Sequence, residues 1–93
     1  MFKINHYFDN KVSSIAYTST VGESTLGVME SGEYEFATSK HEVMNVIEGK
    51  LTVLLPGETE WKSFVSGESF NVEANVSFKV KVESNTSYLC QYS

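Results

Sequence analysis

Short strand-like segments, each rich in β-branched or aromatic residues, follow one another along the whole chain of 93 residues. Turn residues separate most of these segments, and none shows a convincing helical period. Many short strands at this spacing are typical of a β-sandwich or barrel. We therefore predict an all-β fold in a single domain over residues 1–93, with strands at 14–18, 26–29, 33–38, 43–47, 51–55, 61–65, 69–72, 77–82 and 87–92.

Alternation of apolar and polar residues indicates which side chains face the interior. In residues 78–83 apolar residues alternate strictly with charged ones, and residues 33–38 follow the same pattern. Residues two apart on a strand share a face, so one set in each segment belongs to the core. The side chains that we predict to point inward are Tyr34, Phe36, Thr38, Phe78, Val80 and Val82. Residues 43–47 do not alternate cleanly, which indicates burial on both faces or a bend.

Glycines mark the turns between the predicted strands. Gly32, Gly49 and Gly67 lie between strand-like segments, where a turn commonly needs a positive φ angle. Pro56-Gly57 fits the centre of a type II turn, which would join residues 51–55 and 61–65 as a hairpin.

Charge and composition exclude several classes of partner. The net charge is −5, and all seven basic side chains are lysines scattered among twelve acids, a surface that repels nucleic acid. Without arginine, an anion must be held by backbone N–H groups, hydroxyls or lysine. The single cysteine, Cys90, excludes an internal disulfide, and we expect it to be a small buried hydrophobe on a strand.

Targeting signals are also missing from the sequence as given. No apolar segment approaches the roughly 20 residues of a membrane helix, and the first residues do not resemble a signal peptide. We therefore expect a cytoplasmic protein without membrane or nucleic-acid partners.

Glu42 is the carboxylate whose position allows a catalytic role. It begins the apolar segment 43–47 and follows the inward-facing Thr38 closely. One interpretation is a solvated carboxylate at the end of a strand. The other is a partly buried carboxylate at a barrel mouth, whose pKa desolvation would raise, as is common for acid/base residues.

The positions of several residues resemble the two motifs of the cupin family. Gly32, Glu42, Gly49 and the following strand with Pro56-Gly57 are similar to the first motif. Gly67 followed by residues 70–78 is similar to the second. The resemblance implies a cupin-like, jelly-roll β-barrel.

The metal ligands of that family are replaced in this chain. Cupins carry two histidines before the glutamate and a third in the second motif, and the matching positions hold Phe36, Thr38 and Phe78. One carboxylate does not replace three imidazoles as ligands of a transition metal. Because the three histidines are absent, we expect no metal and no cofactor.

An ordered set of segments over nearly the whole chain resembles one family more closely, the small bacterial pyrimidine/purine nucleoside phosphorylases. The segments are 27–29, 32–38, 53–57, 70–72 and 88–92, with Trp61 between them. The resemblance implies a homodimer that cleaves purine and pyrimidine nucleosides with phosphate, giving free base and pentose 1-phosphate. The sequence departs from the family at 73–75, which often contain Pro-Gly, and at Glu23 and Gln91, near which some members carry a basic residue.

This activity suggests roles for the candidate residues. Phosphorolysis passes through a transition state resembling an oxocarbenium ion, so Glu42 would bind ribose hydroxyls or steady positive charge on the sugar. The aromatic residues would stack on the base, and the hydroxyl residues, with backbone N–H groups up to His41, would hold phosphate. The predicted substrate-binding residues are Tyr34, Phe36 and Phe78 for the base, and Thr38 and Ser39 for phosphate.

Two other functions fit the same residues. The aromatic side chains can equally form an ordinary barrel core. A non-catalytic cupin that binds a small sugar or nucleoside as an effector would have the same pocket, and a purely structural dimeric module would have it sealed.

Overall fold

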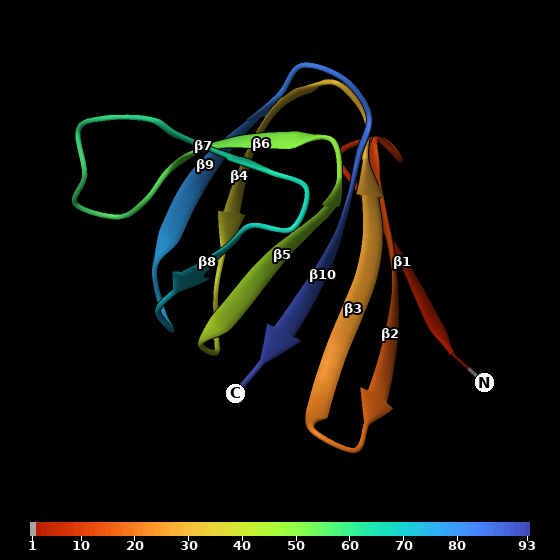
Figure 1. The fold of residues 1–93 in the computed structure, drawn as a ribbon. Helices are drawn as coiled ribbons and strands as arrows, with labels where there is room; N and C mark the ends of the chain where they lie inside the picture. The colour runs from red at the N-terminus through yellow and green to blue at the C-terminus, as the bar shows by residue number, and fades with distance from the viewer. Residues whose placement is uncertain (1) are drawn as a thin grey trace.

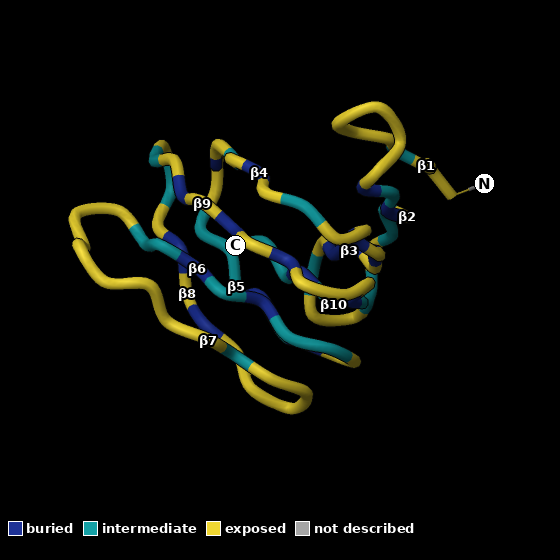
Figure 2. Tube along the Cα trace, turned by 90° about the horizontal axis from the view of Figure 1, so that it is seen from above, coloured by how far each residue is buried: buried dark blue, intermediate teal, exposed yellow. Residues whose placement is uncertain are grey.

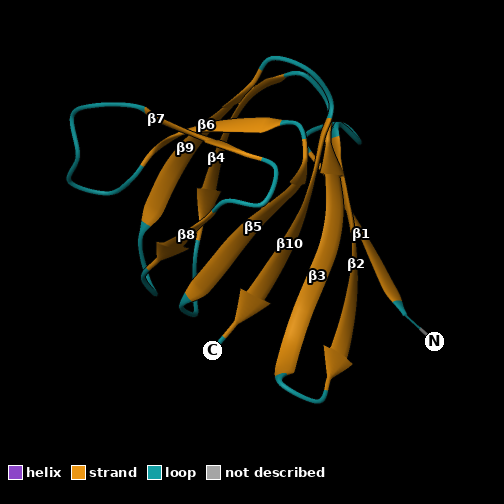
Figure 3. Cartoon of the chain, in the orientation of Figure 1, coloured by secondary structure: helices purple, strands orange, loops and turns teal. Residues whose placement is uncertain are grey.

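The computed structural model describes residues 2–93, which form ten strands and no helix (Figures 1 and 3). The strands are β1 (Lys3–Tyr7), β2 (Val12–Ser19), β3 (Gly22–Met29), β4 (Gly32–Ala37), β5 (Glu42–Glu48), β6 (Lys50–Leu54), β7 (Lys62–Val65), β8 (Ser69–Val72), β9 (Ser77–Val82) and β10 (Thr86–Tyr92). Across the described residues, no helix is long and apolar enough to cross a membrane. The prediction of an all-β fold is confirmed.

Two antiparallel sheets make up the structure. The larger sheet has the order β1-β2-β3-β10-β5-β8, and the smaller has the order β4-β9-β6-β7. The C-terminal strand β10 therefore lies between β3 and β5, so that the end of the chain joins segments from its first half (Figure 1). Strands far apart in sequence thus build the inner face of the larger sheet together.

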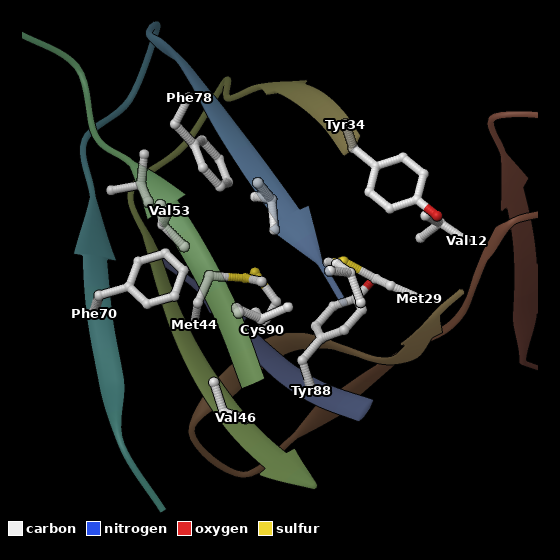
Figure 4. Close-up of a cluster of buried hydrophobic side chains, with 14 residues drawn as sticks. Val12, Met29, Tyr34, Met44, Val46, Val53, Phe70, Phe78, Tyr88 and Cys90 are labelled. Carbon is white, nitrogen blue, oxygen red and sulfur yellow. The ribbon is translucent and has the colours of Figure 1, made fainter. Parts of the chain in front are cut away.

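The core lies between the two sheets. Its buried apolar side chains come from both, and in the close-up Phe78 of the smaller sheet lies across from Met44 and Cys90 of the larger (Figure 4). Seen from above, buried segments line the inside, whereas the hairpin near the N-terminus and the loop between β6 and β7 are exposed (Figure 2). The buried core residues are Val12, Met29, Tyr34, Met44, Val46, Leu51, Val53, Phe70, Val72, Phe78, Val80, Val82, Tyr88 and Cys90.

The predicted facing of the strands is confirmed. In β9, Phe78, Val80 and Val82 are buried and alternate with exposed residues, while Phe36 of β4 is partly buried against the core. The irregular pattern predicted in residues 43–47 coincides with a β-bulge, because the pairing with β10 skips Ile47. A bulge adds one residue to a strand and bends it, and Ile47 here turns to the outer surface.

Strand β1 was not predicted from the sequence. It pairs with β2 through a turn in which Phe8, Asp9 and Asn10 all have positive φ angles, and no glycine marks that turn. Asp and Asn tolerate this conformation, but a bulky residue such as Phe does not adopt it without cost. Phe8 packs its ring against Tyr34 and Phe36, at centroid distances of 5.0 and 5.4 Å, which helps to offset that cost.

The predicted glycine turns are present. Gly32, Gly49, Gly57 and Gly67 all have positive φ angles, and Glu58 N–H donates to the carbonyl of Leu55 at 3.1 Å across Pro56-Gly57. At Gly49 the requirement is twofold, since φ is +106° and a Cβ would lie 2.4 Å from the hydroxyl of Thr86. That buried hydroxyl accepts a hydrogen bond from the Lys50 N–H, so glycine at this position lets β10 close over the β5–β6 turn.

Candidate functional site

A cavity of about 170 Å³ lies between the two sheets. The larger sheet supplies most of its lining, and β4 and β9 of the smaller sheet supply the rest. The residues that line it are Tyr7, Ser14, Thr25, Met29, Phe36, Ala37, Glu42, Met44, Phe78, Tyr88, Cys90 and Tyr92. The two walls differ in chemistry.

The wall from the smaller sheet is aromatic. Phe36 and Phe78 are directly opposite each other on β4 and β9, and their rings stack at a centroid distance of 5.7 Å and an interplanar angle of 29°. Phe8 meets Phe36 edge-on from the β1–β2 turn. This wall offers flat apolar surface to a ligand.

The wall from the larger sheet carries the polar groups of the cavity, among them Glu42. Glu42 is the first residue of β5 and pairs in register with Tyr92 of β10 and Val72 of β8. The Cys90 thiol donates a hydrogen bond to Oε1 of Glu42 at 3.4 Å. The carboxylate therefore lies at the end of a buried strand and has a neutral hydrogen-bond donor as its partner.

Burial sets the protonation of this wall. Desolvation raises the pKa of Glu42, and the Cys90 hydrogen bond and nearby His41 only partly oppose it. Burial, with the Glu42 carboxylate beside it, raises the pKa of Cys90 to about 12, so the thiol remains protonated and able to donate. Desolvation also raises the pKa of Tyr92, which stays a neutral phenol.

Hydroxyl groups extend the polar wall on either side of Cys90. The hydroxyls of Thr25 and Tyr92 lie 3.1 Å apart and join β3 to the end of β10. On the other side Tyr88 lies over Gly27, its register partner, where a Cβ would meet the Tyr88 hydroxyl at 2.5 Å. Glycine at position 27 is thus what lets the Tyr88 ring lie flat along the sheet.

Three of the predicted site residues meet in this cavity. Glu42, Phe36 and Phe78 all line it, with the carboxylate on one wall and the two rings on the other. Glu42 is half-buried, which matches the alternative of a partly buried carboxylate rather than that of a solvated one.

The other three predicted residues lie outside the lining. Tyr34 is buried and donates its hydroxyl to the Glu30 carbonyl at 2.5 Å. The hydroxyl of Thr38 donates to the Glu73 carbonyl at 2.6 Å and accepts from the Val76 N–H at 3.1 Å, rather than contacting Glu42. Ser39 is exposed in the connection between β4 and β5.

Known proteins resemble this chain in sequence over nearly its whole length. The model of the family "Pyrimidine/purine nucleoside phosphorylase" matches residues 2–92. A protein of that name from Pseudoalteromonas atlantica is 60% identical over 92 residues, which cover 99% of each chain. This chain belongs to the pyrimidine/purine nucleoside phosphorylase family. Another member, from Pseudomonas syringae pv. syringae, is 54% identical over the same length, again with 99% of each chain covered.

Solved structures agree with the family's fold. A protein of unknown function from Vibrio parahaemolyticus is 42% identical, with a TM-score of 0.96, and the match covers 100% of this chain and 99% of that one. An RmlC-like cupin from Shewanella frigidimarina superposes with a TM-score of 0.74 at 18% identity, covering 99% of this chain and 83% of that one. The predicted cupin-like β-barrel is confirmed.

The cavity of this family member does not offer the donors of a cupin metal site. The positions that the cupin motifs assign to histidine hold Phe36, Thr38 and Phe78, which supply two hydrocarbon rings and a hydroxyl already bonded to backbone. Within residues 2–93, no three His, Cys, Asp or Glu side chains gather closely enough to hold a metal ion. The residues present therefore do not fit such an ion.

Several lining residues were missed by the sequence reasoning. Cys90 is buried on β10, as predicted, but its hydrogen bond to Glu42 was not foreseen. Tyr92 was placed on a predicted strand but not among the site residues, and Thr25 was not predicted to belong to the site. The alternation along β10 carried a usable signal, because residues 88, 90 and 92 must share one face of the strand.

Proposed function

We propose that the protein is a broad-specificity nucleoside phosphorylase, a pentosyltransferase of the glycosyltransferase class. It uses phosphate to cleave the N-glycosidic bond of purine and pyrimidine nucleosides, giving free base and (deoxy)ribose 1-phosphate. Membership of the family supports this reaction. The structural observation that supports this reaction is the cavity, which has an aromatic wall and a wall with hydroxyl groups. A nucleoside has the matching parts, a flat ring and a hydroxyl-rich sugar.

The base lies on the aromatic wall in this proposal. Phe36 and Phe78 present stacked rings to the cavity, with Tyr34 packed against Phe36 behind them at 6.1 Å between centroids. Stacking does not distinguish bases, since every base has a π-face. An aromatic wall with few polar groups therefore suits both purines and pyrimidines.

Glu42 faces the sugar and acts on the transition state. A phosphate oxygen forms the new bond to the anomeric carbon, while the bond from that carbon to the base nitrogen breaks and its electron pair leaves with the base. Positive charge develops on the sugar between these events. The Glu42 carboxylate is partly shielded from water, which supports its proposed role in stabilising that charge. Phosphate is the nucleophile, so Glu42 forms no covalent bond.

Phosphate enters at the β4–β5 connection. Ala37 and Glu42 line the cavity at either end of that connection, and Ser39 lies between them. Lys40 is the next residue, and its ammonium group lies 3.0 Å from a carboxylate oxygen of Glu23 at the exposed surface. The Ser39 hydroxyl and the Lys40 charge together supply the kind of anion site that a chain without arginine can build. Thr38 contributes by holding this connection in place.

The assembly that we propose is a homodimer formed through an apolar patch on the outer face of the larger sheet. Ile4, Ile15 and Leu26 stand in one cross-strand row on β1, β2 and β3, and all three are exposed. Val28 and Ile47 extend the same patch. A contiguous exposed apolar surface of this kind is typical of an interaction site, and the family resemblance names a second copy as the occupant.

The cytoplasm is the proposed location. Cys90 supports this location, because a free thiol is ordinary in a reducing compartment. Family membership supports a nucleoside and inorganic phosphate as the partners. The negative net charge opposes binding to nucleic acid or to an anionic membrane.

The deciding experiment follows base release from purified protein with a mixture of purine and pyrimidine nucleosides, in the presence and absence of phosphate. We expect release from both classes only when phosphate is present. Equal release without phosphate would identify a hydrolase. Absence of release from every nucleoside would favour a non-catalytic protein that binds a sugar or nucleoside as an effector.

A further inference from the structure

The hydroxyl pair formed by Thr25 and Tyr92 belongs to the polar wall, and the proposed reaction gives it no role. The two oxygens lie 3.1 Å apart, and both residues line the cavity. Tyr92 also stands opposite Glu42 in the pairing of β10 with β5. The pair is therefore held between two strands, close to the carboxylate that we assign to the sugar.

The chemistry of the pair defines the ligand that it can bind. Each hydroxyl has one donor hydrogen and two acceptor lone pairs, so the bond between the two leaves one donor and several acceptor positions for a ligand. A sugar hydroxyl both donates and accepts, and it matches that set. Phosphate mainly accepts, so a pair with one free donor matches it less well than it matches a sugar hydroxyl. No Lys, Arg or His is among the described residues that line the cavity, so this pair has no cation beside it to hold an anion.

We propose that the Thr25–Tyr92 hydroxyl pair binds a ring hydroxyl of the pentose and so determines the sugar specificity of the site. The bound group is one of the 2′- and 3′-hydroxyls of a ribonucleoside. This proposal rests on the proposed function only in taking a nucleoside as the ligand. A site built to hydrogen-bond a ligand hydroxyl discriminates against the analogue that lacks it, because its own polar groups are then left unpaired.

The test is binding of inosine, 2′-deoxyinosine and 3′-deoxyinosine in phosphate-free buffer, measured by titration calorimetry. Wild-type protein should bind inosine roughly tenfold more tightly than one of the two deoxynucleosides, the size expected for neutral hydrogen bonds. Tyr92→Phe should weaken inosine binding by about the same factor and change the affinity for that deoxynucleoside by less than about twofold. Such a difference between ligands isolates the interaction with the missing hydroxyl.

Two further variants keep the test decisive. Thr25→Val removes the partner hydroxyl with nearly the same shape, and should reproduce the effect even if Tyr92→Phe does not fold. Tyr17→Phe makes the same chemical change at a half-buried tyrosine that does not line the cavity, and should leave all three affinities unchanged. Equal loss for all three ligands, no loss for any, or no binding of inosine to wild-type protein would overturn the proposal.

Failure of this inference and failure of the phosphorylase function give different results. Wild-type protein that binds inosine with the predicted pattern, but releases no base when phosphate is added, would refute phosphorolysis and leave the inference standing. Phosphate-dependent release with no preference among the three ligands in the binding test would refute the inference alone.

Discussion

At the residue scale, Glu42 is unusual in having a thiol rather than a cation as its partner. The Cys90 thiol donates to the carboxylate at 3.4 Å, and its own raised pKa of about 12 keeps it neutral. A cation would hold the pKa of the carboxylate low and neutralise its charge, whereas a thiol does neither fully. Glu42 therefore keeps a charge that is free to act on a ligand.

Replacing Glu42 with glutamine should separate its catalytic role from any structural one. Glu42→Gln removes the charge and nearly preserves the shape, and we expect turnover to fall by roughly 100-fold or more. The melting temperature should not fall, because the amide oxygen can still accept from Cys90 and no buried charge has to be desolvated. Glu48→Gln, at the exposed end of the same strand, is the matched control and should change neither quantity. Turnover by Glu42→Gln close to that of wild-type protein would remove Glu42 from the mechanism.

The raised pKa of Glu42 also predicts the pH dependence of the reaction. The carboxylate is lost as the pH falls through its pKa in the folded protein, which burial places above the ordinary value of 4.5. The ratio kcat/KM should therefore decline on the acid side with a midpoint above 4.5. In Glu42→Gln the residual activity should lack that decline. An acid limb of the same midpoint in the variant would mean that another group is being titrated.

At the scale of the secondary-structure elements, Thr38 joins the end of β4 to the turn between β8 and β9. Its hydroxyl and backbone bond to residues 73 and 76, and its carbonyl accepts from the Asn75 N–H at 3.0 Å. This set of bonds fixes the start of the connection that leads to Glu42. The position is the one that cupin motifs assign to a metal ligand, and here we infer that it carries a structural contact.

Thr38→Val tests the structural role of this residue. The change leaves the Glu73 carbonyl and the Val76 N–H without their side-chain partner, and we expect the free energy of unfolding in urea to fall by about 1–3 kcal/mol. The KM for phosphate should stay within about twofold. Thr18→Val on the exposed part of β2 serves as a control for the substitution itself. Unchanged stability with a much higher KM for phosphate would instead support the phosphate-binding role predicted from the sequence.

The strands differ in how well the sequence predicts them, and the reasons are physical. Strands β8 and β9 begin and end where alternation and flanking turn residues predict. Strand β1 was not predicted, because its turn has Phe8, Asp9 and Asn10 where glycine would be expected. Packing of Phe8 against Phe36 compensates for the strained backbone of that turn. Local patterns do not report a compensation that depends on tertiary contacts.

The same distinction applies to the site. Phe36 and Phe78 were predictable, since each belongs to a strand whose alternation shows its inner face. The Thr25–Tyr92 pair joins residues that are 67 positions apart, and it exists only because β10 lies between β3 and β5. Sequence patterns fix which face of a strand is buried, but they do not fix which strands become neighbours.

At the scale of the whole molecule, the two faces of the larger sheet have different tasks. The inner face carries the polar wall of the cavity, and the outer face carries the apolar patch that we assign to a dimer interface. The side chains alternate between these faces along β3, where Thr25 points inward and Leu26 outward. One sheet thus carries the cavity lining and the apolar patch on opposite faces.

Charge placed in the apolar patch should dissociate the dimer. Leu26 is 45% exposed at the middle of the patch, and Leu26→Glu would bury two carboxylates against apolar surface in a symmetric interface. We expect wild-type protein to sediment as a dimer and this variant as a monomer at micromolar concentration. Val21→Glu, at a residue 79% exposed in the β2–β3 turn outside the patch, should leave the dimer intact. A monomeric wild-type protein, or a dimeric Leu26→Glu, would contradict this interface.

The claim that the chain carries out phosphorolysis is tested most directly by the identity of the sugar product. Phosphorus NMR can follow inosine and inorganic phosphate in the presence of wild-type protein, with hypoxanthine measured in the same sample. We predict that the inorganic phosphate signal is replaced by one of ribose 1-phosphate, with one molecule formed for each base released. Release of base with the phosphate signal unchanged, and free ribose as the product, would contradict the account.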